Sequence, residues 1–140
     1  MAVKDIVKGI CNITRCKYDV YTKERTDEFN TYLTEETFTG KYWVNGKKIY
    51  RKTINLGTLP NNEVYTVLHN INDLDYMISI RGTAYRTLDS TYFPIPYTSV
   101  DDEYSIQLTI SKELAIIQTK IDRSTIDNCW VILEYTKTTE

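Results

Sequence analysis

The chain has 140 residues, and its 17 Lys and Arg against 19 Asp and Glu give a formal net charge of −2. This length fits one domain with its own hydrophobic core, and the interleaved charges predict no cationic surface for nucleic acid or an anionic membrane. The longest apolar run, residues 129–133, is far below the roughly 20 residues of a membrane-spanning helix, and the N-terminus lacks the apolar region of a secretory signal. We therefore expect a protein that is made in the cytoplasm and has neither nucleic acid nor a membrane as a partner.

An apolar residue recurs at helical spacing within residues 1–16, at Val3, Ile6, Ile10 and Ile13. This spacing predicts a short helix with one apolar stripe. A helix of this length is marginal in water by itself, so the stripe must dock on another surface. Its own β domain, identical helices in a short coiled coil, and a different protein are the three alternatives. We designate these four residues the anchoring residues.

The segment that follows, up to about residue 40, is charged and polar with isolated aromatic residues, which is typical of an extended connector. From residue 42 onward the apolar residues alternate with a period of two, the period of β-strands. We therefore divide the chain into residues 1–31, an N-terminal anchoring helix with its connector, and residues 32–140, a β module that is displayed.

The sequence YWVNGKKIYRKTI, residues 42–54, predicts a β-hairpin. Asn45 and Gly46 stand between two strand-like runs, and an Asn-Gly pair tolerates the two positive φ angles of a type I′ turn. We therefore expect a tight two-residue turn at these positions.

Further strand-like runs recur about every ten residues, with turn residues between them. The clearest is EYSIQLTI, in which Tyr104, Ile106, Leu108 and Ile110 face one way and polar residues face the other, as in a half-buried antiparallel strand. The remaining runs are residues 63–70, 75–82, 83–88, 113–120 and 129–136. Seven to nine short strands and no second long helical pattern predict a mainly β fold, an antiparallel β-sandwich or jelly-roll-like domain.

The sequence predicts no catalytic, metal or cofactor site. His69 is the one histidine and no nucleophile motif accompanies it, so we interpret it as structural. Cys129 is one of three cysteines without disulfide or zinc spacing, and we interpret it as a buried apolar residue. The acids at 100–104 lack the spacing of a calcium loop. The paired carboxylates of the connector, such as Glu35 and Glu36, are not on a rigid scaffold of the kind that a glycosidase needs.

Twelve tyrosines are present, and tyrosine suits both strands and half-exposed interfaces, including the stacking faces that bind sugars. In STYFPIPYTSVDD, the aromatic residues Tyr92, Phe93 and Tyr97 follow no regular period, and Pro94 and Pro96 exclude a central strand. We therefore place the three aromatic residues on an edge or loop. There they either cap the sandwich or serve as recognition residues for a partner.

The order of several short motifs resembles the C-terminal module of structural proteins of tailed bacteriophages, namely tail fibres, baseplate proteins and head fibres. The motifs are YLTEETFTGKYWVNGKKIYRKTI, LPNN, TVLHNI, DRS and VILEYTKTTE, and they span about residues 32–140. The matching positions are Trp43, Gly46, Lys47, Ile49, Tyr50, Leu59, Pro60, Asn61, His69, Ile71 and residues 135–139. Asn45 and Asn70 replace the family's usual Asp and Gly, and since Asn also tolerates positive φ, both turns are expected to persist.

The resemblance implies a non-enzymatic structural virion protein, a head or tail fibre-type appendage that forms a homotrimer and contacts the host surface. Fibre proteins that carry this module are usually much longer, whereas only about 31 residues precede it here. This favours a small appendage whose N-terminus binds a capsid, collar or fibre protein. The implied partners are these virion proteins and a host cell-surface glycan.

Two other classes of function stay open. One is a glycan-binding or glycan-cleaving protein that uses the aromatic residues from Tyr92 to Tyr97, and the other is a cytosolic adaptor unrelated to virions. An enzyme would lose turnover when a carboxylate such as Glu35 or Asp101 becomes the amide, whereas a structural module has no turnover to lose.

Overall fold

The computed structural model describes residues 30–139, and the predicted N-terminal helix with its anchoring residues Val3, Ile6, Ile10 and Ile13 lies outside them. The described part is mainly β, as predicted. Its elements are β1 Thr37–Tyr42, β2 Lys48–Asn55, β3 Val64–Leu68, β4 Leu74–Arg86, β5 Thr91–Ile95, the 3₁₀ helix η1 Asp102–Tyr104, β6 Ile106–Ile110, β7 Leu114–Thr119 and β8 Asn128–Lys137.

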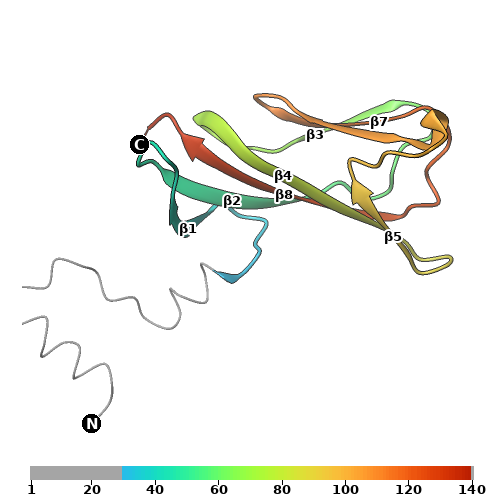
Figure 1. Cartoon of the computed structure of the whole chain (residues 1–140), viewed down its shortest axis with the longest axis horizontal. Helices are drawn as coiled ribbons and strands as arrows, with labels where there is room; N and C mark the ends of the chain where they lie inside the picture. Colours follow the sequence, from blue (N-terminus) through green and yellow to red (C-terminus); the bar gives the residue numbers. More distant parts are fainter. Residues whose placement is uncertain (1–29, 140) are drawn as a thin grey trace, which may run out of the picture. The chain divides into compact units, whose positions relative to one another are not determined.

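The strands form two antiparallel sheets. One has five strands in the order β1-β2-β8-β4-β5, and the other has three in the order β3-β7-β6. In Figure 1 the strands β3 and β7 are drawn above β4 and β8 in this view. The C-terminal strand β8 lies at the centre of the larger sheet, between β2 and β4, so the last strand of the chain closes the fold.

The hydrophobic core takes side chains from both sheets. Along β8 the burial alternates, and Cys129, Val131 and Leu133 are fully buried. They belong to one cluster with Ile106 of β6 and Ile117 of β7. The period of two read from the sequence therefore places one face of each sheet on a shared core.

The first strand begins earlier than predicted, because residues 37–42 already pair with β2. The residues before it also contact the module: Leu33 accepts a hydrogen bond from the Thr53 N–H at 3.0 Å, and the Arg51 guanidinium lies 4.6 Å from the centre of the Tyr32 ring. Because Tyr32 and Leu33 already contact β2, the predicted extended connector ends before residue 40.

The predicted opening hairpin is confirmed, but its predicted turn type is wrong. Gly46 has a φ of +83°, whereas Asn45 is not left-handed, so the two positive φ angles of a type I′ turn are absent. The Gly46 N–H donates to the Trp43 carbonyl at 2.9 Å, and the Asn45 Oδ1 accepts the Lys47 N–H at 3.0 Å. The Asn side chain thus fixes a longer loop with Gly46 as its single left-handed residue.

The two strands predicted at residues 75–82 and 83–88 form one continuous strand, β4. Gly82 does not mark a turn between them. A Cβ added to Gly82 would lie 2.8 Å from the Cβ of Ile95 on the neighbouring strand β5. The glycine therefore permits a close approach of two neighbouring strands. In a sequence, a glycine in this role looks the same as a glycine in a turn.

The strand predicted from EYSIQLTI is confirmed for residues 106–110, where Ile106 is buried and Gln107 and Thr109 are exposed. It pairs antiparallel with β7. Tyr104, which was expected on the same face, lies instead in η1, because the strand starts two residues later.

Candidate recognition site

The structure separates the three predicted recognition residues. Tyr92 and Phe93 lie on β5, which is an edge strand, as expected from Pro94. Tyr92 is 70% exposed, whereas Phe93 is only 8% exposed and faces the core opposite Ala84. Neighbouring residues of a strand point to opposite faces, so Phe93 is a core residue and not an exposed contact residue.

Tyr97 follows β5 and is half-buried. Its backbone exchanges two hydrogen bonds with Ile106, at 3.0 and 2.9 Å, and these fix the loop against β6. Its ring packs edge-on against Phe93, with 5.4 Å between the ring centres. Tyr97 therefore links the exposed loop to the core.

An open cleft of about 470 Å³ lies beside Tyr97. Its lining residues come from the loop after β5, from η1 and from β6: Pro96, Tyr97, Thr98, Asp102, Ser105, Ile106, Gln107, Leu108 and Thr109. The hydroxyl and amide groups offer hydrogen bonds, and the tyrosine and proline offer apolar faces. This combination suits a small polar ligand such as a sugar.

Two arginines outside the predicted site residues lie around Phe93, and one of them, Arg123, belongs to the DRS motif. The guanidinium of Arg86 is 5.2 Å from the centre of the Phe93 ring, and that of Arg123 is 5.4 Å from it. Arg86 holds Asp89 through two hydrogen bonds of 2.9 and 2.7 Å, and this pair lowers the pKa of Asp89 to about 2. Neither arginine belongs to an apolar period of the sequence, so only the packing reveals that both lie beside Phe93.

Arg123 comes from the loop between β7 and β8. Its backbone N–H donates to the Pro60 carbonyl at 3.1 Å, and its guanidinium also lies 5.8 Å from the centre of the Tyr104 ring. Burial lowers the pKa of Arg123, and the charge of Arg86 lowers it further. The side chain is therefore held between aromatic rings and close to a second positive charge.

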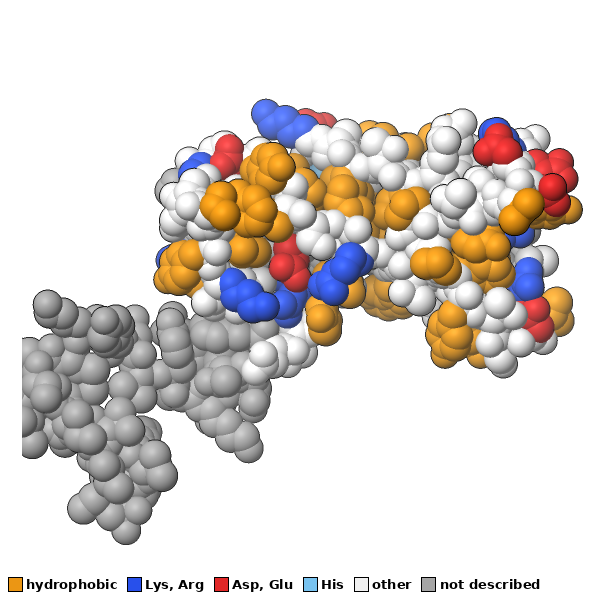
Figure 2. Space-filling view, viewed as in Figure 1, with side chains coloured by type: hydrophobic (Ala, Val, Ile, Leu, Met, Phe, Trp, Pro, Cys, Tyr) orange, Lys and Arg blue, Asp and Glu red, His pale blue; other side chains and the backbone are white. Residues whose placement is uncertain are grey.

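On the face shown in Figure 2, the exposed hydrophobic side chains do not gather at one place. Figure 2 shows them in orange at several separate positions on one face, with Lys or Arg and Asp or Glu side chains between them. The large exposed ones include Tyr42, Val44, Tyr76, Leu88, Tyr92 and Trp130. Two aromatic pairs include an exposed member: Trp43 stacks on Tyr76 with ring centres 6.0 Å apart, and Tyr85 lies tilted against Tyr92 at 4.6 Å.

His69 has the structural role predicted from the sequence. It is 1% exposed, its Nδ1 accepts the Ile71 N–H at 3.1 Å, and its Nε2 lies 3.1 Å from the Ser111 carbonyl. Because Nδ1 is the acceptor, Nε2 carries the proton and donates to Ser111. Asn70, the residue that replaces the family's glycine, has a φ of +52°, so the expected left-handed turn is present.

Cys129 is confirmed as a buried residue, and burial raises the pKa of its thiol to about 12. Glu36 bonds the Tyr135 hydroxyl and the Lys137 ammonium, and Asp102 pairs with Lys120. The Cys129 thiol is therefore buried, and the Glu36 and Asp102 carboxylates are engaged in hydrogen bonds or ion pairs. No group of three or more His, Cys, Asp or Glu in residues 30–139 is arranged to hold a metal ion.

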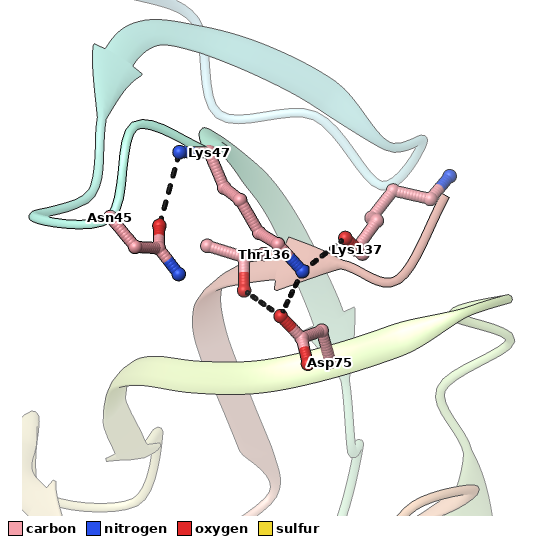
Figure 3. Close-up of polar contacts among 5 residues, drawn as sticks. All are labelled: Asn45, Lys47, Asp75, Thr136 and Lys137. Atoms are coloured by element: carbon pink, nitrogen blue, oxygen red, sulfur yellow. Dashed lines mark hydrogen bonds and ion pairs between the residues drawn. The ribbon is translucent and has the colours of Figure 1, made fainter. Parts of the chain in front are cut away.

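The opening hairpin is tied to two other strands through Lys47. Its Nζ lies 2.6 Å from Asp75 of β4 and 3.4 Å from the carbonyl of Lys137 on β8. The Thr136 hydroxyl adds a bond of 3.2 Å to the same Asp75 carboxylate (Figure 3). Positions near both ends of the resemblance therefore meet in one polar framework.

Comparison of the chain with family models, with curated proteins and with solved structures finds no match in any of the three. Within the described residues, no helix has the length and hydrophobicity needed to cross a bilayer.

Proposed function

We propose that the protein is a non-enzymatic structural protein of a tailed-bacteriophage virion, a head or tail fibre-type appendage. In this proposal residues 1–31 attach to a capsid, collar or fibre protein through the anchoring residues, and residues 32–140 are displayed toward the host surface. The chain acts as a homotrimer, and its chemistry is binding and assembly.

The observation that carries the proposal is the position of the motif residues that the resemblance uses. Lys47 bonds Asp75 and the last strand, and His69 bonds the backbone on both sides of its ring. Pro60 of LPNN accepts the backbone N–H of Arg123 in DRS. Two pairs of motifs far apart in the sequence therefore bond to each other, through Lys47 with Lys137 and through Pro60 with Arg123, as expected when a module is shared for its framework and varied on its surface.

We further propose that the two sheets form a β-sandwich or jelly-roll-like domain. The support is the shared core, in which Ile106 and Ile117 of one sheet pack with Val131 and Leu133 of the other. In sandwiches the inner faces of two sheets interdigitate in this way.

The direct test is to find the protein on particles. Antibodies raised against the purified chain are expected to label heads or tails of phage particles from the strain that carries this gene, by immunogold electron microscopy. Particles from a strain with the gene deleted are the control. Intact native particles without label, or protein only in the unassembled fraction, contradict the proposal.

The oligomeric state tests the homotrimer. Light scattering at several concentrations would compare the full chain with a variant that replaces the four anchoring residues by serine. If the full chain and the variant are both trimers, the β module drives assembly. If only the full chain is a trimer, the anchoring residues form a coiled coil. Monomers for both contradict the homotrimer.

Glycan binding is the second candidate function, favoured by the cleft beside Tyr97 with its hydroxyl and amide groups. A glycan array probed with the labelled full chain is expected to show selective binding, and Tyr97→Ala should abolish it. Tyr42→Ala, which removes an exposed tyrosine outside the cleft, is the matched control. Equal loss in both variants, or no binding by the native chain, contradicts this candidate.

A further inference from the structure

Within residues 30–139, Arg123 is a buried cation without an ion-paired acid. Its side chain belongs to a residue only 9% exposed, and its Nε has no hydrogen-bond partner in the part of the chain that the structure describes. The guanidinium joins none of the ion pairs formed within residues 30–139. A buried charge of this kind normally has a partner, because desolvation without one is costly.

Arginine cannot relieve this cost by losing its proton, since it stays charged in proteins. The rings of Phe93 and Tyr104, at 5.4 and 5.8 Å, compensate part of the charge through cation–π contacts. Arg86, on the same Phe93 ring, adds a second positive charge. The rings hold the guanidinium in place, and its Nε donor has no partner within the described residues.

Three aspartates, one from each of the segments that carry Arg86, Tyr104 and Arg123, are engaged in other bonds. Asp89 is bound by Arg86 in a bidentate pair, and Asp102 is paired with Lys120. Asp122, the neighbour of Arg123, accepts the backbone N–H and hydroxyl of Ser124 at 2.9 and 2.6 Å. Within residues 30–139 none of these three carboxylates forms an ion pair with Arg123.

We propose that Arg123 binds the carboxylate of an acidic sugar, with the sugar ring against Tyr97 and Tyr104. The planar fork of a guanidinium matches a carboxylate in a bidentate pair. Tyr97 connects the two parts of the site, because it lines the cleft and packs against the Phe93 ring that carries both guanidiniums. Thr98 and Ser105 line the same cleft and offer hydroxyl groups to the sugar.

This inference deepens the second candidate function and names its substrate class. It rests on glycan binding and is independent of display on a virion. If immunogold labels the particles but no acidic sugar binds, only the present inference is contradicted. If an acidic sugar binds but no particle is labelled, only the virion proposal is contradicted.

The test is calorimetric titration of the full chain with sodium glucuronate and sodium N-acetylneuraminate, with glucose as the neutral probe. At least one acidic sugar is expected to bind and glucose is not. Arg123→Met should weaken the binding at least about tenfold, the size expected when one charge-assisted pair is lost. Arg81→Met removes an exposed arginine of β4, paired with Glu134 at 3.2 Å, and should leave binding unchanged.

Thermal unfolding without ligand keeps the result interpretable. Because Arg123→Met removes an unpaired buried charge, its unfolding temperature should equal or exceed that of the native chain. A variant that folds and still binds the acidic sugar, or a native chain that binds neither acid, overturns the proposal. Loss of an oligomer in Arg123→Met without any acid-sugar binding also overturns it, since the carboxylate is then an acidic side chain of another copy.

Discussion

The hydroxyl of Tyr135 donates a hydrogen bond of 2.6 Å to Glu36, although 99 positions separate the two residues in the sequence. Tyr135 is fully buried on the last strand, and Glu36 immediately precedes the first strand. The other oxygen of Glu36 lies 2.7 Å from the Lys137 Nζ. Burial raises the pKa of Tyr135 and the Glu36 carboxylate raises it further, so the phenol keeps its proton and acts as the donor.

Tyr135→Phe should destabilise the module by about 1–2 kcal/mol, because it removes a buried hydrogen bond to a charged acceptor while the ring still fills its place. Glu36→Gln should cost about 1 kcal/mol, since the amide can still accept a bond but no longer pairs with Lys137. Urea unfolding followed by tryptophan fluorescence measures both.

A double variant with both Tyr135→Phe and Glu36→Gln measures the contribution of the bond between the two side chains. If the Tyr135 and Glu36 side chains act through each other, the two single costs should sum to more than the cost of the double variant. Additive costs would mean that the observed contact contributes nothing of its own to stability.

His69→Ala should destabilise the module by about 2–4 kcal/mol, because it leaves a cavity and removes the acceptor of the Ile71 N–H and the donor to the Ser111 carbonyl. Lys112→Ala, an exposed change in the adjoining turn, is the control and should stay within about 0.5 kcal/mol of the native chain. Chemical denaturation of the two variants checks this, and equal stability of both would contradict the structural role of His69.

The parts of the fold that the sequence predicted are those set by local pattern. Alternation in residues 106–110 predicted which side chains are buried, and a lone histidine without a nucleophile motif predicted a structural residue. These rules act within a few positions of one another, so a single sequence contains them. Residues 1–16 were also interpreted by periodicity, and they lie outside the described part.

The parts that were not predicted depend on contacts between distant segments. The sequence predicted a strand end at Gly82, yet the strand continues and the lack of a Cβ permits the approach of Ile95. Phe93 and Tyr92 could not be told apart until the strand direction fixed which of them faces the core. The contacts of Arg123 could not be predicted, because Phe93, Tyr104 and Arg86 come from segments that only the fold brings together.

Gly82→Ala should separate β5 from β4 and destabilise the module by about 1–3 kcal/mol, because the new Cβ would lie 2.8 Å from the Ile95 Cβ and 3.1 Å from its carbonyl oxygen. Thr83→Ala, at an exposed position of the same strand, is the matched control. Hydrogen exchange of the β5 amides should rise selectively in Gly82→Ala. Unchanged exchange and stability would contradict the close approach.

Cys129 should resist iodoacetamide at about pH 8 in the folded chain and react after unfolding in urea, because only the thiolate is the nucleophile. Burial raises the pKa of its thiol to about 12 and also blocks access. Mass spectrometry of peptides distinguishes Cys129 from the other two cysteines of the sequence. Alkylation of Cys129 at the same rate in both states would contradict its buried position.

Acid should destabilise the module through four aspartates whose pKa values are lowered in the folded state. Arg86 lowers the pKa of Asp89 to about 2, and Lys47, Ser124 and Thr87 lower those of Asp75, Asp122 and Asp127 through hydrogen bonds. A folded-state pKa below the unfolded value adds stability that is complete above the unfolded pKa and disappears as the pH falls through the folded one. The thermal midpoint should therefore be level above about pH 5 and should fall between about pH 4 and pH 2.

Asp75→Asn and Lys47→Met should each reduce the fall of the thermal midpoint with pH. The reason is that the bond from Lys47 is the largest cause of the lowered pKa of Asp75. Both variants should also unfold at a lower temperature than the native chain near neutral pH, where the pair is complete, and the difference from the native chain should shrink in acid. Calorimetric midpoints across the pH series measure this. A midpoint that rises on acidification, or a difference that stays constant with pH, would contradict the assignment to the Lys47 and Asp75 pair.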